Sequence, residues 1–212
     1  IHVKGFELAN GDQHVHVDGL ISKEEADVLD VKFEKFDLAT LAGLTNPLGI
    51  ELKGELDGDL QIYSLLKNPY VSADVSSSDI FYNNREIGDM VLKAKMDPTT
   101  DLVGMNMEIT RQEVQTLRIT GEYNAKAEAN SLNLNARLDD SEIVLFEPFL
   151  KNLVSDLVGT VSADIDITGT PFNPIISGDC QFNKASFTVN YLKTRYTIHD
   201  KVSIRNSTIE LQ

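Results

Sequence analysis

Few residues in this sequence have the types and spacing that chemistry requires. Ser64 and Lys67 have the Ser-x-x-Lys spacing of one class of serine nucleophile, but the companion motifs of that class are absent. His14 and His16 alternate with valines, so both imidazoles fall on one face of an expected strand, and no third metal ligand is near in sequence. We interpret the first pair as a chance match and the second as part of a solvent-facing strand.

Four aspartates could be interpreted as pairs of catalytic acids. They are Asp57, Asp59, Asp164 and Asp166. Each pair lies on the regular polar face of an expected strand, where charge opposes aggregation between sheet edges. No glycine-rich phosphate loop precedes a helix, and no nucleophile elbow occurs. The sequence therefore predicts no catalytic residue, no metal site and no cofactor, and it predicts that the protein is not an enzyme.

The composition is that of an ordinary globular protein, with 42% hydrophobic and 25% charged residues in a chain of 212. The formal charge of −14 argues against binding to nucleic acid and against attraction to anionic lipid headgroups. Cys180 stands alone, so we expect no internal disulfide and a buried, small apolar side chain. Both ends are patterned like strands and no leader is recognisable, so we expect a segment of a larger protein whose anchor and targeting signal lie outside it.

The strongest pattern is the alternation of apolar and polar residues, which is typical of strands with one buried face. Between Glu51 and Ile62 the even positions are apolar or glycine and the odd positions are polar. A second segment, from Leu157 to Thr168, alternates in the same way. Each segment has about twice the usual strand length and would span about 40 Å. These stretches predict two long strands in a large sheet.

Shorter alternating runs predict further strands, separated by turn residues such as Asn-Gly, Asn-Asn and Asn-Pro. Helix is scarce: apolar residues with helical spacing follow Asp37, which suits an N-cap, and recur around Pro148, which suits a helix start. The sequence thus predicts an all-β fold with one or two short helices. The further expected strands cover residues 3–8, 13–21, 28–36, 70–82, 87–96, 102–109, 114–123, 132–138, 175–190, 195–199 and 202–209.

The two long segments belong to an internal duplication with an offset of 105 residues. Residues 54–74 and 159–179 share seven identical positions without a gap, including an Asn-Pro step in each. The short helical segments fall at the same offset. We therefore divide the chain into a preceding hairpin over residues 1–27, a first unit over 28–132 and a truncated second unit over 133–212, all within one continuous domain.

Two long strands with one apolar side need a cover for that side, and the sequence leaves two arrangements open. A second sheet would bury it in a closed sandwich. Gly54, Gly58 and Gly159 instead favour bending, and a sheet curled lengthwise would leave a half-pipe groove with an apolar interior. Such a groove could shelter acyl chains at roughly 0.8 kcal/mol per buried methylene. The residues that would line it are Leu52, Leu56, Leu60, Ile62, Val161, Ile165 and Ile167.

The segment from Leu145 to Leu150, followed by Gly159 to Gly178, resembles the TamB family of the AsmA-like superfamily. In that family a short L-x-x-L helix leads into strands punctuated by Gly, Gly-Thr and Pro. The next residues, Lys184 to Ile198, look like the version from Bacteroidetes-type bacteria, and the close resemblance covers about residues 140–206. The first unit departs from the pattern, because Ser64 replaces the second glycine and the Gly-Thr step is missing.

The resemblance implies a taco-shaped sheet in the periplasmic part of a large protein, anchored in the inner membrane of a Gram-negative bacterium. It also implies an Omp85-type outer-membrane barrel as partner, and it supplies no catalytic residues. The leading hypothesis is a non-enzymatic envelope-biogenesis module that supports outer-membrane protein assembly, secretion or phospholipid transport. Its groove would hold phospholipid acyl chains or nascent outer-membrane β-strands. The competing hypothesis is a closed β-sandwich that acts as a structural or adhesive surface module without lipid.

Overall fold

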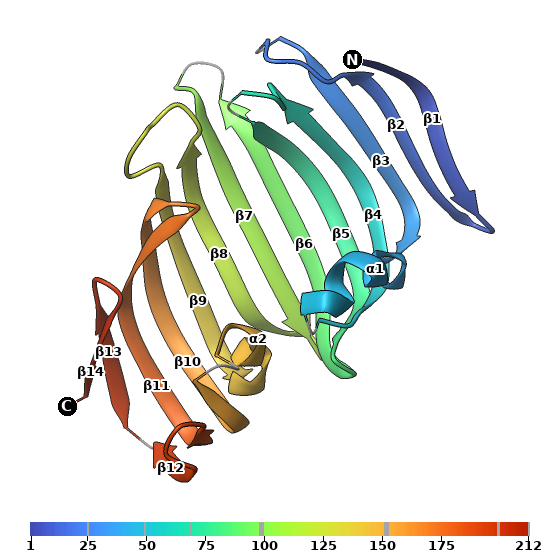
Figure 1. Ribbon diagram of the computed structural model, residues 1–212. Helices are drawn as coiled ribbons and strands as arrows, with labels where there is room; N and C mark the ends of the chain where they lie inside the picture. The colour runs from blue at the N-terminus through green and yellow to red at the C-terminus, as the bar shows by residue number, and fades with distance from the viewer. Residues whose placement is uncertain are drawn as a thin grey trace.

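The computed structural model describes residues 1–24, 26–48, 50–67, 69–97, 100–150, 153–198 and 200–211. These residues form one open antiparallel sheet of fourteen strands with two short helical segments (Figure 1). From β1 to β11 each strand pairs with the next in sequence, and β11 then pairs with both β12 and β13. The described part of the chain is therefore a meander within a single sheet, not a two-sheet sandwich.

The strands agree with the expected segments within a few residues for most of the chain. They are β1 (His2–Asn10), β2 (Gln13–Leu20), β3 (Val28–Asp37), β4 (Leu52–Tyr63), β5 (Tyr70–Tyr82), β6 (Arg85–Asp97), β7 (Leu102–Arg111), β8 (Val114–Asn124), β9 (Leu132–Glu142), β10 (Val154–Thr170), β11 (Asn173–Val189), β12 (Thr194–Ile198), β13 (Lys201–Arg205) and β14 (Thr208–Leu211). The long strands β10 and β11 have 17 residues each.

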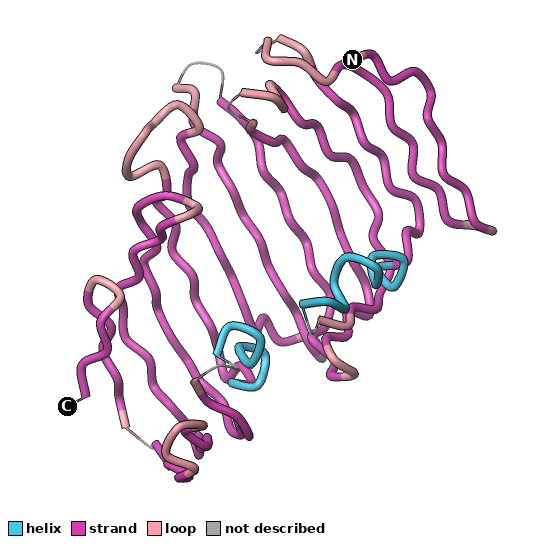
Figure 2. The backbone as a smooth tube through the Cα atoms, in the orientation of Figure 1, coloured by secondary structure: helices cyan, strands magenta, loops and turns pink. Residues whose placement is uncertain are grey.

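The helical segments are short, as expected, and both lie at the same end of the strands (Figure 2). The first begins after Asp37, whose Oδ1 accepts a hydrogen bond from the backbone N–H of Ala39 at 2.9 Å, so the predicted N-cap is confirmed. The segments are η1 (Leu38–Leu41), α1 (Ala42–Thr45) and η2 (Asn46–Leu48), then η3 (Ile143–Phe146) and α2 (Glu147–Leu150).

Two neighbouring rows of paired residues show how the faces of the sheet differ. The first row is apolar or glycine throughout: Leu8, Val15, Phe33, Gly58, Val75, Leu92, Met107, Ile119, Ala136, Ile165, Gly178 and Ile204. The row beside it is polar throughout: Glu7, His16, Lys32, Asp59, Asp74, Lys93, Asn106, Thr120, Asn135, Asp166 and Ser177. Because successive side chains of a strand point to opposite faces, one face of the sheet is apolar and the other polar.

The apolar face has no second layer over it among the described residues. The accessible surface is 12992 Å², whereas a compact monomer of 23.5 kDa has about 9,800 Å². Val75 and Ala136 in the apolar row are nevertheless only 8% and 6% exposed. The side chains of the apolar face are therefore closely packed even without a second layer.

Buried apolar side chains gather in two clusters along the sheet. One joins Ile143 and Val144 of η3 to Leu157 and Val161 of β10, so the second helical segment packs against the apolar face. The other cluster lies in the middle strands and contains Tyr70, Ala73, Ala94 and Val103, with Leu60 packed against it.

The irregularities of the sheet recur at the same offset of 105 residues. Register shifts lie at Phe33–Phe36 and Lys53–Glu55 in the first unit, and at Leu138–Ser141 and Val158–Thr160 in the second. Left-handed backbone also recurs in pairs: Lys35 with Asp140, Gly54 with Gly159, Ser64 with Gly169 and Asp79 with Lys184. Chance would not place four such pairs in one register, which supports the duplication. The division at residues 27/28 and 132/133 stays a prediction.

The structure corrects two local expectations. The expected strand over residues 202–209 is a hairpin of β13 and β14, because Asn206 and Ser207 adopt φ of 49° and 62° and form a turn. Asn173 and Pro174, expected as a turn, instead begin β11, and the turn falls two residues earlier. Of the other expected turn residues, Asn68 and Pro98 lie outside the described residues.

Candidate functional site

The seven predicted groove residues all lie on the apolar face of the sheet. Val161 and Ile165 of β10 are 5% and 9% exposed, and the others are partly exposed. Gly58 of β4 and Ile165 of β10 belong to the same row of pairs, which places the apolar sides of both strands on one face. Residues Leu52, Leu56, Leu60 and Ile62 come from β4, and Val161, Ile165 and Ile167 come from β10.

The two sets are not adjacent, however. Six strand-to-strand steps separate β4 from β10, which is about 29 Å along the sheet. The strands between them add apolar residues to the same face that the sequence analysis did not single out. The alternation of Ala73, Val75 and Ser77 with polar residues was the signal that could have found them. The intervening members of the row are Val75, Leu92, Met107, Ile119 and Ala136.

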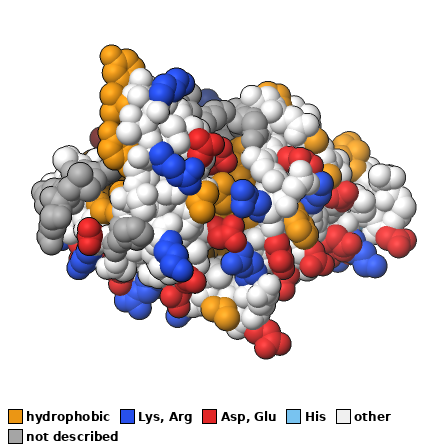
Figure 3. Space-filling model, turned by 90° about the horizontal axis from the view of Figure 1, so that it is seen from below, with side chains coloured by type: hydrophobic (Ala, Val, Ile, Leu, Met, Phe, Trp, Pro, Cys, Tyr) orange, Lys and Arg blue, Asp and Glu red, His pale blue; other side chains and the backbone are white. Residues whose placement is uncertain are grey.

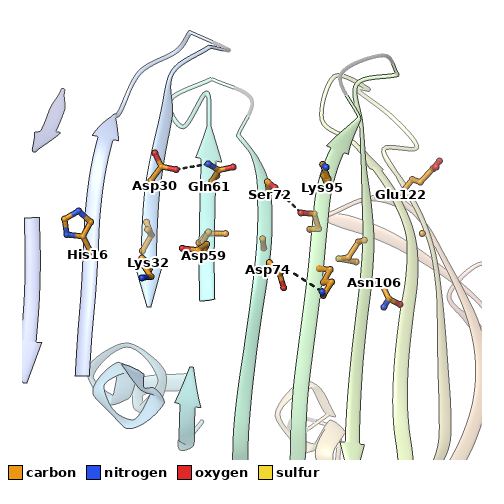
Figure 4. Close-up of a pocket in the computed structure, with 18 of the residues that line it drawn as sticks. His16, Asp30, Lys32, Asp59, Gln61, Ser72, Asp74, Lys95, Asn106 and Glu122 are labelled. Carbon is orange, nitrogen blue, oxygen red and sulfur yellow. Dashed lines mark hydrogen bonds and ion pairs between the residues drawn. The ribbon is translucent and has the colours of Figure 1, made fainter. Parts of the chain in front are cut away.

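A hollow of about 1090 Å³ spans β2 to β9, and most of its lining belongs to polar strand positions (Figure 4). Among the predicted groove residues, all of which are described, Leu60 alone lines it. Its polar side chains pair with one another: Gln61 Nε2 donates to Asp30 Oδ1 at 2.8 Å, and Lys93 Nζ lies 3.6 Å from Asp74 Oδ2. The charged and polar groups of these two pairs neutralise or hydrogen-bond each other at the surface. They do not form an arrangement of nucleophile and base.

A row of charges on the polar face repeats in both units. Asp59 pairs directly with Asp74, which alone would be unfavourable, but Lys32 and Lys93 flank them in the row. In the second unit Asp164 pairs with Asp179, and the flanking cations are Arg137, 3.1 Å from Asp164, and Lys201, 3.0 Å from Asp179. The predicted interpretation of these aspartates as parts of a polar strand face therefore agrees with their surroundings.

Asp179 has the most stabilised carboxylate of this row. The hydroxyl of Ser203 donates to it at 2.6 Å, and Lys201 and Arg205 lie within 3.4 Å. The hydrogen bond from Ser203, then that from Lys201, lowers its pKa from 3.8 to about 2. The group is a structural anion at neutral pH and not a proton donor.

The candidate chemical residues have structural partners. Ser64 is 2% exposed and its hydroxyl donates to the backbone oxygen of Lys23 at 3.2 Å, so this serine has a structural partner. His14 Nδ1 lies 3.1 Å from Glu7 Oε1, and His16 is exposed. Within the described ranges, no group of three His, Cys, Asp or Glu side chains could hold a metal ion.

Cys180 is buried at 7% exposure in the cluster around β10, as expected. Burial raises the pKa of its thiol, and the neighbouring carboxylate of Asp179 adds to the rise. The thiol therefore stays protonated at neutral pH and packs as an apolar group.

Comparison with known protein families decides the identity of this sheet. Residues 105–209 match the family model described as TamB C-terminal domain. The chain belongs to the TamB family. The match begins in β7 and ends in β14, so it extends further upstream than the resemblance over residues 140–206. Searches of curated proteins and of solved structures found no significant match.

The TamB family is a non-enzymatic family associated with the cell envelope, so membership implies an envelope protein. The family as a whole is associated with partners in outer-membrane protein assembly. The open, curled sheet fits a TamB-like envelope module. No helix in the described part of the chain is long and apolar enough to cross a membrane.

Proposed function

We propose that this chain is a periplasmic, TamB-like transport module whose apolar face holds the acyl chains of phospholipids. The observation that carries the proposal is the uncovered row of apolar residues across twelve strands, with a polar row beside it. A single-layer sheet that keeps one side apolar needs an apolar occupant for that side. In this proposal the parent protein is anchored in the inner membrane and an Omp85-type barrel is its outer-membrane partner.

The chemistry of the face favours acyl chains over nascent β-strands as the occupant. The backbone N–H and C=O groups of the interior strands are already paired with neighbouring strands. The face therefore offers methyl and methylene groups but few hydrogen-bonding partners for a second backbone. A nascent strand would leave its own polar groups unpaired there, whereas an acyl chain gains about 0.8 kcal/mol per buried methylene.

Site-specific photo-crosslinking tests this proposal with a control one residue away. Benzoylphenylalanine at Leu56 or Leu60 faces the apolar side, and at Asp57 or Asp59 it faces the polar side. With a fluorescent phosphatidylethanolamine we expect adducts at Leu56 and Leu60 only. Equal labelling at Asp57 and Asp59 would contradict an apolar groove.

A mutational test uses the amount of lipid that copurifies with the protein. Leu56→Asp and Ile165→Asp each place a carboxylate on the apolar face. Burying an unpaired carboxylate beneath an acyl chain is strongly unfavourable. We therefore expect the copurifying phospholipid to be absent from the native mass spectrum of each variant. Ser76→Asp lies on the polar side, opposite Asp57, and should retain it. Circular dichroism of each variant separates lost binding from lost folding.

A further inference from the structure

Exposed apolar side chains gather at one end of the sheet, beyond the apolar face itself. We call them the C-terminal rim and define it as Leu153, Val158, Tyr191, Leu192 and Tyr196. Their exposures are 65%, 55%, 93%, 54% and 43%. Figure 3, which looks at the molecule from below, shows a projecting ridge of hydrophobic side chains on the side of the C-terminal strands.

Strand pairing brings the rim residues together from three parts of the chain. The backbone N–H of Asn190, next to Tyr191, donates to Leu153 O at 3.0 Å. Val158 of β10 pairs with Ser186 of β11, and Ser186 pairs with Thr197 of β12, so Val158 lies on the opposite face of these strands from Tyr196, which pairs with Phe187. The rim therefore occupies one end of β10, β11 and β12, with Val158 on one face and Tyr196 on the other.

One rim side chain also touches the edge of the apolar core. The rings of Tyr196 and Phe187 lie 6.3 Å apart, and Phe187 packs against the cluster that contains Val161 and Ile165. The rim therefore borders the apolar face, although its own side chains point into solvent.

The charges around the rim differ from those of the rest of the chain. The chain has 33 Asp and Glu residues and a net charge of −14, yet residues 180–199 contain none of them. Three cations, Lys184, Lys193 and Arg195, lie in that stretch; Lys184 is exposed opposite the bulge at Gly159, and Lys193 forms the turn after Leu192. Asp156 lies in sequence between Leu153 and Val158, so these three cations and this one acid together carry a positive charge.

The first unit shows that this rim is not a requirement of the fold. Where β11 is followed by a turn with Tyr191 and Leu192, β5 is followed by the tight turn of Asn83 and Asn84, at the same end of the sheet. A polar turn therefore suffices to connect these strands. The apolar and basic turn of the second unit needs another explanation.

We propose that the C-terminal rim inserts into the interface of a phospholipid bilayer that contains anionic headgroups. Tyrosine has an apolar ring and a polar hydroxyl, which suits the boundary between headgroups and acyl chains. Lysine and arginine keep apolar stems against that boundary while their charges meet lipid phosphates. The positive local charge in an acidic chain is complementary to such a surface, and the inference does not depend on lipid binding in the groove.

Vesicle co-sedimentation of the full chain tests this inference. We expect wild-type protein to bind phosphatidylcholine vesicles that contain phosphatidylglycerol. Tyr191→Ser/Leu192→Ser should weaken the partition coefficient about tenfold or more, because two apolar groups lose their burial. Lys193→Gln/Arg195→Gln should weaken it about fivefold per cation on these vesicles and change little on pure phosphatidylcholine.

Phe172→Ser is the matched control for the rim. Phe172 is 93% exposed, as Tyr191 is, but it lies in the turn at the opposite end of β10 and β11. The variant should bind vesicles as the wild type does. Absence of wild-type binding, an equal loss in Phe172→Ser, or rim variants that dissociate a protein dimer instead of releasing lipid would each overturn the inference. Crosslinking at Leu56 tests the groove separately, so failure of one does not imply failure of the other.

Discussion

At the scale of single residues, the polar face is stabilised by short-range pairing and not by isolated charges. The two aspartates of each cross-strand pair would repel each other if no cation lay beside them. Cations lie beside each pair: Lys32 and Lys93 are the neighbours in the row in the first unit, and Arg137 is the neighbour in the row in the second. Lys201, two residues before the row neighbour Ser203, contacts Asp179 through its side chain. Asp179 is the clearest example, because a hydroxyl and an ammonium group donate to it.

The lowered pKa of Asp179 predicts how stability depends on pH. A carboxyl whose folded pKa is depressed, here to about 2 from 3.8, stabilises the fold above the unfolded pKa. This contribution should be lost as pH falls from about 4 to about 2. We expect Asp179→Asn to flatten that part of the pH profile, measured by urea unfolding. Asp12→Asn, in the β1–β2 turn, is the control, and a profile for Asp179→Asn that matches the wild type would contradict the prediction.

At the scale of secondary structure, the bulges determine where the long strands bend. Gly54 and Gly159 stand at equivalent bulges with φ of 132° and 104°. A Cβ at Gly159 would lie 2.5 Å from the backbone oxygen of Lys184, so a side chain there meets backbone and not a movable neighbour. Glycine therefore occupies both equivalent positions because any other residue would adopt this backbone conformation only with strain.

Replacement of Gly159 by alanine should destabilise the protein. Strained backbone and a contact with the next strand together predict a loss of about 1–3 kcal/mol in the free energy of unfolding. Gly104→Ala is the matched strand control, because its Cβ would meet only Lys95 O at 3.9 Å. Equal unfolding midpoints in urea for the two variants would count against this role of Gly159.

At the scale of the whole molecule, the protein keeps a large surface exposed for its size. The surface of 12992 Å² exceeds the compact expectation because one sheet has no covering layer. The two apolar clusters lie along the sheet, and the helical segments add cover at one end of the strands (Figure 2). In the proposed function, this open face is the surface on which acyl chains bind.

The open shape can be tested in solution. A compact domain of 212 residues would have a radius of gyration of about 17 Å. We expect small-angle scattering of the monomer to give a larger value, because the single layer extends along the sheet. A concentration series controls for association. A monomer value at the compact expectation would show that the sheet closes in solution.

The sequence by itself determined the class of the fold, most strand positions and the 105-residue duplication. Alternation fixes which side of each strand is apolar, and Asn, Gly and Pro fix many turns, because these are local properties. The N-cap at Asp37 and the burial of Cys180 were also within reach of local reasoning. Local patterns failed at the Asn206–Ser207 turn, where a short hairpin looks like one alternating strand.

The tertiary structure alone decided between a closed sandwich and an open sheet. That choice depends on which strands pair, and pairing is a non-local property that alternation leaves open. Pairing also placed the apolar sides of β4 and β10 on one face, yet about 29 Å apart. The five strands between them complete the apolar face, and the three strands at the C-terminal end assemble the rim from segments that are distant in sequence.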